Sequence, residues 1–310
     1  MLEPQATAVL DRLYAEDTAQ RAAGLPSSQR TRNVDRETGE WLNLLIRAMG
    51  TEGDIAILGG NQNSANMEAR VRGFSEAIAL YPDIEIVENI SSEESIARAI
   101  INVEDVMADN PRLDGWFFAG MWPFFVCIDG IPQFEAGVRH SNMRAVTFDA
   151  LPATLQAMQE GYLHGIVGQN YWDWGYRSVY MMYDYIMKEE TYSRFTRMPL
   201  QVVTRSNVDS LMAAWETYDF SDPLPPAFPP EDGVFTMAWI PKQLNNPVFE
   251  LGRDSCAQAA RELTSRYAPI QVECLYMGTG SADMAAQAQL INDMVAQGVD
   301  AIAVSCNSDV

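Results

Sequence analysis

Three polar segments in the C-terminal quarter of the sequence each follow a short apolar run. They are Lys242–Asn246, Gly278–Ser281 and Ser305–Ser308. Their amide and hydroxyl side chains both donate and accept hydrogen bonds. This chemistry suits a neutral polyol better than a phosphate, so we expect these segments to bind a small ligand that carries several hydroxyls.

The apolar runs before these segments alternate with helical patterns. Residues 235–240, 270–276 and 301–304 are predicted to be strands, while residues 247–266 and 282–297 have apolar residues at helical spacing. This order predicts a parallel sheet with right-handed crossovers. Ligands bind such sheets beyond the carboxyl ends of the strands, which is where the three polar segments fall.

The rest of the chain continues the alternation and predicts a second lobe. Strands are expected at 53–58, 84–89, 115–119, 145–149, 165–168 and 201–204. Helices are expected at 4–23, 36–49, 66–74, 93–109, 152–160 and 173–188, with a turn and helix at 124–136. The predicted fold class is therefore α/β, with two doubly wound parallel-sheet lobes. A chain of 310 residues is long enough for two such cores.

Two stretches carry a more specific resemblance. IPKQLNNPVFELG, at 240–252, and GTGSADMAAQAQLINDMVAQGVDAIAVS, at 278–305, resemble the opening of a periplasmic sugar-binding protein of the type I, ribose-binding-like family. The resemblance implies two lobes with a hinge and an interlobe cleft. It also implies capture of a small carbohydrate by hinge closure, delivery to the membrane subunits of an ABC importer, and a monomer without cofactor or catalysis.

In that family the matching segments open the chain, whereas here they close it. The resemblance therefore implies a circularly permuted order, with the two chain ends halves of one turn. The expected division is 234–310, 1–35 and 169–198 in one lobe, 36–168 and 199–206 in the other, and a proline-rich connector at 207–233. The family's fourth strand, with its sugar-binding aspartate, has no recognisable counterpart in residues 22–30.

The resemblance also implies ligand-binding positions. Arg70 lies in a segment, Asn66–Phe74, that resembles the family's N-x-x-x-R-x-x-G-F helix start, and a guanidinium donates well to vicinal hydroxyls. Asp149 and Gln169 end apolar runs where the family binds ligand, and Trp122 offers an aromatic face to sugar C–H groups. The predicted set is Lys242, Asn245, Asn246, Phe249, Asn63, Arg70, Trp122, Asp149, Gln169 and Asn307.

Structural interpretations of the same residues stay open. Arg70 is equally a surface arginine, Asp149 a cap for a helix beginning at Pro152, and Phe249 a residue that packs on a helix face. Three cysteines, Cys127, Cys274 and Cys306, lie in or beside apolar strands and are expected to be buried free thiols. A Cys256–Cys274 disulfide is the alternative.

Composition excludes several classes of function. A net charge of −21 argues against nucleic acid and anionic membranes, because phosphates repel such a surface. The cysteines and two histidines lack zinc-ligand spacing, so no metal is expected. No catalytic motif of a hydrolase, metalloprotease or nucleotide-binding enzyme occurs. The stretch 115–131 is too short to span a bilayer.

Localisation and three alternatives complete the predictions. The sequence opens without the basic and apolar regions of a signal peptide, although the resemblance implies a periplasmic or extracytoplasmic parent protein. One alternative is an engineered, permuted scaffold with weakened or no binding. Another is an autoinducer-2-like signal receptor, since the IPK motif is shared with such receptors. An enzyme is the least favoured.

Overall fold

The computed structural model describes residues 53–306 except 63, 80, 194, 195, 197, 199 and 217–232, together with residues 19 and 23. These residues form two compact units. Unit 1 holds 53–169 and 200–216, and unit 2 holds 170–198 and 233–306. Gln169, predicted to begin the other lobe, belongs to unit 1.

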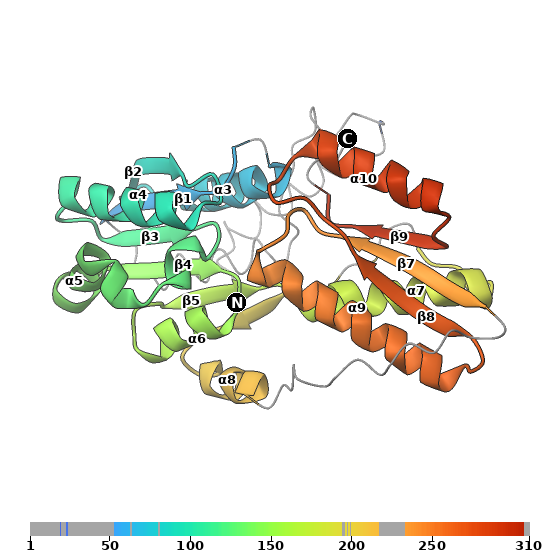
Figure 1. Cartoon of the computed structure of the whole chain (residues 1–310). Coiled ribbons are helices and arrows are strands. Elements are labelled where there is room, and N and C mark those ends of the chain that lie inside the picture. The colour runs from blue at the N-terminus through green and yellow to red at the C-terminus, as the bar shows by residue number, and fades with distance from the viewer. Residues whose placement is uncertain are drawn as a thin grey trace. The chain divides into compact units, whose positions relative to one another are not determined.

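Unit 1 is an α/β sandwich around a six-stranded sheet of order β2-β1-β3-β4-β5-β6 (Figure 1). Its strands are β1 Gly53–Gly59, β2 Ile84–Ser91, β3 Gly115–Phe118, β4 Arg144–Phe148, β5 Gly165–Gly168 and β6 Gln201–Val203. Its helices are α3 Ala65–Ile78, α4 Ile96–Asp109, α5 Pro132–Ser141, α6 Pro152–Gln159 and α8 Val208–Glu216, with 3-10 turns η2 Trp122–Phe125 and η3 Ile128–Gly130. The α/β prediction is confirmed.

The central strands are buried on both faces, which is why they read as continuous apolar runs. On one face, Phe117 of β3 stacks on Phe74 of α3, with ring centroids 3.9 Å apart. On the other, Phe118 meets Phe134 of α5 edge to face at 5.7 Å. Successive strand residues thus point to opposite helix layers.

Two details of unit 1 differ from the predictions. β6 pairs antiparallel with β5, whereas the other pairs are parallel. Residues 208–216, predicted to be extended connector, form helix α8. The turn and helix predicted at 124–136 agree with the structure, in which the η2 and η3 turns come first and α5 begins at Pro132, a residue that suits the first helical turn.

Unit 2 contains a three-stranded parallel sheet of order β8-β7-β9. Its elements are α7 Tyr171–Met187, β7 Val234–Ile240, α9 Pro247–Arg266, β8 Gln271–Tyr276, α10 Met284–Gln297 and β9 Ala301–Val304. Apolar residues of β7, including Ala238 and Ile240, pack against Met294 of α10. The strand–helix alternation predicted for this region is confirmed.

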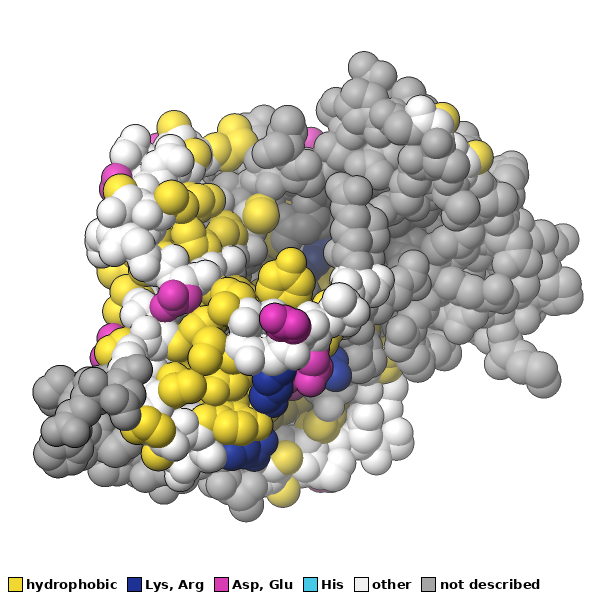
Figure 2. All heavy atoms as spheres, turned by 90° about the vertical axis from the view of Figure 1, so that its right-hand side faces the viewer, with side chains coloured by type: hydrophobic (Ala, Val, Ile, Leu, Met, Phe, Trp, Pro, Cys, Tyr) yellow, Lys and Arg dark blue, Asp and Glu magenta, His cyan; other side chains and the backbone are white. Residues whose placement is uncertain are grey.

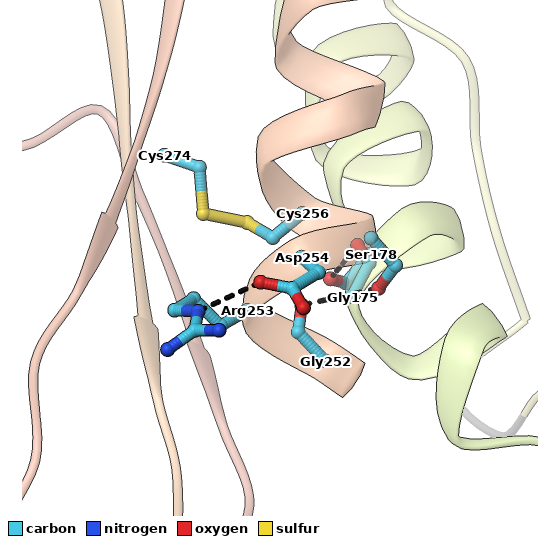
Figure 3. The surroundings of a disulfide bond; sticks show 8 residues. Gly175, Ser178, Gly252, Arg253, Asp254, Cys256 and Cys274 are labelled. Carbon is cyan, nitrogen blue, oxygen red and sulfur yellow. Dashed lines mark hydrogen bonds and ion pairs between the residues drawn. A yellow bond between two sulfur atoms is a disulfide. The ribbon is translucent and has the colours of Figure 1, made fainter. Parts of the chain in front are cut away.

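Helices α7 and α9 approach very closely at a pair of glycines. A Cβ atom added to Gly175 of α7 would collide with the carbonyl oxygen of Gly252 and the hydroxyl of Ser255, both in α9. Figure 3 shows Gly175 beside this part of α9. Glycine at 175 therefore sets the distance between the two helices.

A disulfide joins Cys256 of α9 to Cys274 of β8 (Figure 3). The expectation of three buried free thiols is wrong, because Cys274 is in the disulfide and the free cysteines, Cys127 and Cys306, are exposed. Cys127 follows the η2 turn, and Cys306 follows the end of β9, so neither side chain enters a core. The alternative disulfide pairing is confirmed.

Figure 2 shows hydrophobic side chains gathered on the face that it presents, with acidic and basic side chains between them. The exposed large apolar residues of unit 2 include three in the last turn of α7, namely Tyr185, Ile186 and Met187. Surface apolar residues of this kind are common, so their exposure alone does not mark a binding site. None of the described helices combines the length and apolarity needed to cross a bilayer.

Candidate functional site

The carboxyl edge of the unit 1 sheet brings three predicted site residues together. Asp149 follows β4, Gln169 follows β5, and Arg70 reaches this edge from the second turn of α3. Gln169 Nε2 donates to Asp149 Oδ1 at 3.4 Å, and Arg70 Nη1 lies 3.7 Å from the same oxygen. Because β4 and β5 are neighbours in a parallel sheet, their following residues meet at one end.

Arg70 is a buried residue, not a surface arginine. Its residue exposure is 8%, its Nη1 donates to the carbonyl oxygen of Ala119 at 2.6 Å, and its guanidinium lies 4.2 Å above the ring centroid of Phe148. These contacts fix the guanidinium plane beside the ends of β3 and β4. A positioned guanidinium of this kind offers several directed donors.

Asp149 occupies an unusual backbone position. Its φ is 77°, in the left-handed region, and its N–H donates to Val167 of β5 at 2.8 Å. The predicted helix-cap alternative does not hold for its carboxylate, because the N-cap of α6 is Leu151. Instead the backbone carbonyl of Asp149 accepts a bond from Thr154 Oγ1 at 2.7 Å. The strained turn thus sets the direction of the carboxylate.

Trp122 folds back over the ends of two strands. A Cβ atom added to Gly120 would lie 2.7 Å from Trp122 Cη2, and one added to Gly60 would lie 2.9 Å from the same atom. Met67 of α3 also touches Gly60. The indole therefore lies directly against the backbone after β1 and β3, and only 6% of Trp122 is exposed.

A hollow of about 400 Å³ opens beside this edge, on the β2 side. Polar side chains from the segment after β1 and from the end of β2 line it, and they include Asn61, Gln62, Asn89 and Ser91. Asn63, predicted from the same segment, lies outside the described residues, as does Asn307.

In unit 2, the loop after β7 holds the other predicted residues. Asn246 caps α9, because its Oδ1 accepts from the N–H of Val248 at 3.0 Å, and Asn245 takes a left-handed φ of 61°. Lys242 is 5% exposed. Phe249 packs 6.4 Å from the ring centroid of Trp174 of α7, so the packing interpretation of Phe249 is confirmed.

Sequence reasoning missed Gln287, a buried polar residue of α10. Its Nε2 donates to the carbonyl oxygen of Pro241 at 3.0 Å and to that of Ser305 at 2.9 Å. It therefore ties together the polar segments that follow β7 and β9. A glutamine facing inward on an amphipathic helix is the signal that could have identified it.

The most strongly perturbed histidine of unit 1 lies away from this edge. Burial, followed by the charge of Arg144, lowers the pKa of His164 to about 4. Its Nδ1 accepts from the N–H of Ala145 at 3.2 Å, which fixes the neutral ring. In the described part of the chain, no three His, Cys, Asp or Glu side chains are grouped so that they could hold a metal ion.

Comparisons with known proteins agree with the family resemblance found in the sequence. Residues 22–190 match a family profile described as periplasmic binding protein domain. No curated protein matches the chain. The chain is similar to an ABC transporter solute-binding protein of Burkholderia graminis, solved with D-arabinose, at 25% identity and a TM-score of 0.51. That match covers 56% of this chain and 61% of the other.

A second solved structure shares the fold. It is a periplasmic ABC transporter solute-binding protein of Actinobacillus succinogenes with bound D-allose, at 21% identity and a TM-score of 0.51. The match covers 62% of this chain and 66% of that protein. The chain therefore spans somewhat less than two thirds of the length of both relatives.

Proposed function

The chain belongs to the periplasmic binding protein domain family, and from this premise we propose that it binds a small carbohydrate for delivery to an ABC importer. The observation that carries the proposal is the cluster of buried Arg70 and Asp149 with half-buried Gln169 at the carboxyl edge of the parallel strands. Ligands of open α/β sheets bind at this edge.

The chemistry of the cluster suits vicinal hydroxyls. The carboxylate of Asp149 accepts hydrogen bonds, the guanidinium of Arg70 donates them, and the amide of Gln169 does both. Since Arg70 and Asp149 are buried, a ligand that leaves either without a hydrogen bond loses affinity. The solved relatives with D-arabinose and D-allose support a sugar of pentose or hexose size.

Hinge closure is the proposed mechanism of capture. The division between the two units falls at Gln169–Asn170 and again at Pro199–Leu200, so the chain passes between them more than once. A ligand that contacts both units binds a closed form better and shifts the population towards it. The proposed contacts from unit 2 are Lys242, Asn245, Asn246 and Phe249, and those outside the described residues are Asn63 and Asn307.

Compartment and partners are also proposals. A disulfide such as Cys256–Cys274 is typical of an oxidising compartment, which supports an extracytoplasmic location for the parent protein. The proposed partners are the sugar and the membrane subunits of an importer, with the protein acting as a monomer. The circularly permuted order stays a prediction, because both chain ends lie outside the described residues.

A thermal-shift screen against pentoses, hexoses and deoxysugars tests the proposal. A sugar at about 100 times its Kd stabilises the native state by about 2.7 kcal/mol, which raises Tm by several degrees. The Asp149→Asn variant should lose this shift, whereas the exposed control Asp129→Asn should keep it. If no sugar shifts Tm at millimolar concentration, carbohydrate binding is refuted. If an autoinducer-2-type ligand shifts Tm and no sugar does, the protein is a signal receptor instead.

A further inference from the structure

Two helices of unit 2 begin beside residues that the proposed function assigns to the ligand. Helix α7 begins at Tyr171, two residues after Gln169, and α9 begins at Pro247, directly after Asn245 and Asn246. A residue next to the end of a helix follows that end, because planar peptides and fixed bond lengths leave little slack over one or two residues. The first turns of α7 and α9 therefore influence where these polar side chains are held.

Trp174 of α7 joins the two first turns. Its ring centroid lies 4.8 Å from that of Tyr171, in an edge-to-face arrangement, and 6.4 Å from that of Phe249 in α9. Tyr171 and Phe249 are only 2% and 7% exposed, and Trp174 is half-buried between solvent and these rings. Aromatic rings at such separations attract each other in addition to burying apolar area. The start of α9 is therefore held against the start of α7 through one indole.

One turn further along, α9 is enclosed on two sides. Its Gly252 lies against Gly175 of α7, as Figure 3 shows, and a Cβ atom added to Gly252 would lie 2.5 Å from the indole of Trp239. Trp239 is in β7, two residues before the polar loop begins at Pro241. The end of β7, α9 and α7 are thus in direct contact, so the loop at 241–246 is bounded by two elements that both pack in this layer.

The conformation of this loop depends on its ends. Asn245 has a left-handed φ of 61°, and the side chain of Asn246 accepts the N–H of Val248 at 3.0 Å to begin α9. Asparagine tolerates a left-handed φ better than most residues, but it is still an uncommon conformation that neighbouring contacts must maintain. The amides of the loop therefore keep their directions only while the first turn of α9 stays in place.

We propose that Trp174 is a positioning residue for ligand capture, which holds the loop at 241–246 in the orientation in which Asn245 and Asn246 bind the sugar. This inference rests on the proposed function and adds to it a residue that acts through Phe249 and the start of α9. A hydrogen bond weakens steeply when its distance or angle is wrong. The loss of about one hydrogen bond to a sugar hydroxyl weakens binding about 10-fold.

Isothermal titration calorimetry with the full chain tests this. The probe is the pentose, hexose or deoxysugar that gives the parent chain its largest thermal shift, starting with D-arabinose and D-allose. Trp174→Ala should weaken its binding about 10-fold, whereas Trp174→Phe, which keeps a ring between Tyr171 and Phe249, should stay within about threefold of the parent chain. If Trp174→Ala binds as tightly as the parent chain, the inference fails while carbohydrate binding stands. If no sugar binds the parent chain, the proposed function fails and the inference fails with it.

A matched control separates positioning from general stability. Leu263 is in the same helix as Phe249 and is fully buried, but it lies about four turns from the loop. Leu263→Ala should therefore lower Tm and leave the Kd for the sugar within about twofold of the parent value. A loss of affinity in Leu263→Ala as large as that in Trp174→Ala would mean that any loosening of unit 2 weakens binding, and it would overturn the inference.

Hydrogen exchange followed by mass spectrometry locates the effect without a ligand. The N–H groups of residues 248–250 all donate to Asn246, so their exchange reports whether the first turn of α9 is closed. Exchange there should be faster in Trp174→Ala and close to the parent rate in Leu263→Ala. An unchanged rate in a folded Trp174→Ala variant contradicts the inference. If Trp174→Ala does not fold, Trp174→Leu replaces it in both measurements, and the same outcomes decide.

Discussion

Arg70 Nη1 lies 3.7 Å from Asp149 Oδ1, and their side chains are only 9% and 10% exposed. The two charges therefore neutralise each other at the edge where we place the ligand. Each residue has a second anchor, since Arg70 donates to Ala119 O and Asp149 interacts with Gln169. We therefore expect this pair to contribute to stability, and the same contacts hold in place the two groups that the proposed function assigns to hydroxyl binding.

Removing one member of this pair should destabilise unit 1. Arg70→Met leaves the Asp149 carboxylate buried without its cation, and we expect a loss of about 3–5 kcal/mol in the free energy of unfolding. Urea denaturation followed by circular dichroism measures it. Arg72→Met is the matched control, because the Arg72–Glu76 pair is about one-third exposed and should change stability by about 0.5 kcal/mol or less.

The disulfide should stabilise unit 2. Cys256 and Cys274 are separated by 18 residues, and removing a crosslink over a loop of this length costs about 2–4 kcal/mol. The Cys256→Ser/Cys274→Ser variant should therefore melt at lower temperature than the parent chain, and added dithiothreitol should affect only the parent. Cys127→Ser, at an exposed free thiol, is the control and should leave Tm unchanged.

Gly175→Ala should separate α7 from α9. The added methyl meets the backbone of Gly252 and the hydroxyl of Ser255, so one helix must shift, and overpacking of this kind costs about 1–3 kcal/mol. Gly280→Ala is a matched control, because a Cβ there has nothing within 4 Å. Equal unfolding free energies for the two variants would contradict the close approach of the helices.

Acid should weaken unit 1 through His164. The folded-state pKa, about 4, is below the ordinary value of 6.5, so the unfolded chain binds the proton more readily between these pH values. Stability should fall as the pH drops from about 6.5 to about 4, by about 1–2 kcal/mol once partial solvent screening is allowed for. Urea denaturation at several pH values measures how the free energy of unfolding depends on pH. This dependence should be weaker in His164→Gln than in the parent chain, and the exposed His140→Gln variant should match the parent chain.

Local sequence patterns predict the elements of both sheets well. β1, β3 and β7 are apolar runs bounded by polar turns, and their burial follows from that composition. The direction of β6 was not predictable in the same way, because its antiparallel pairing with β5 depends on how the chain returns after α7. Helix α8 also lacked a clear signal beside the proline-rich segment.

Side-chain relationships at the site depended on long-range contacts. The sequence placed Asp149 and Gln169 at strand ends, but their hydrogen bond requires β4 and β5 to be neighbours. The position of Trp122 over Gly60 depends on residues more than 60 apart in the chain meeting across β1 and β3. The resemblance to a known family named the candidate site residues. The tertiary packing around each residue determines whether its structural or its ligand-binding interpretation holds.

The amide of Gln287 joins the loop after β7 to the loop after β9 through hydrogen bonds to Pro241 O and Ser305 O. The two loops are far apart in sequence, yet both are hydrogen-bonded to the side chain of Gln287. A shift of the loop after β7 away from the loop after β9 therefore has to lengthen one of these two hydrogen bonds.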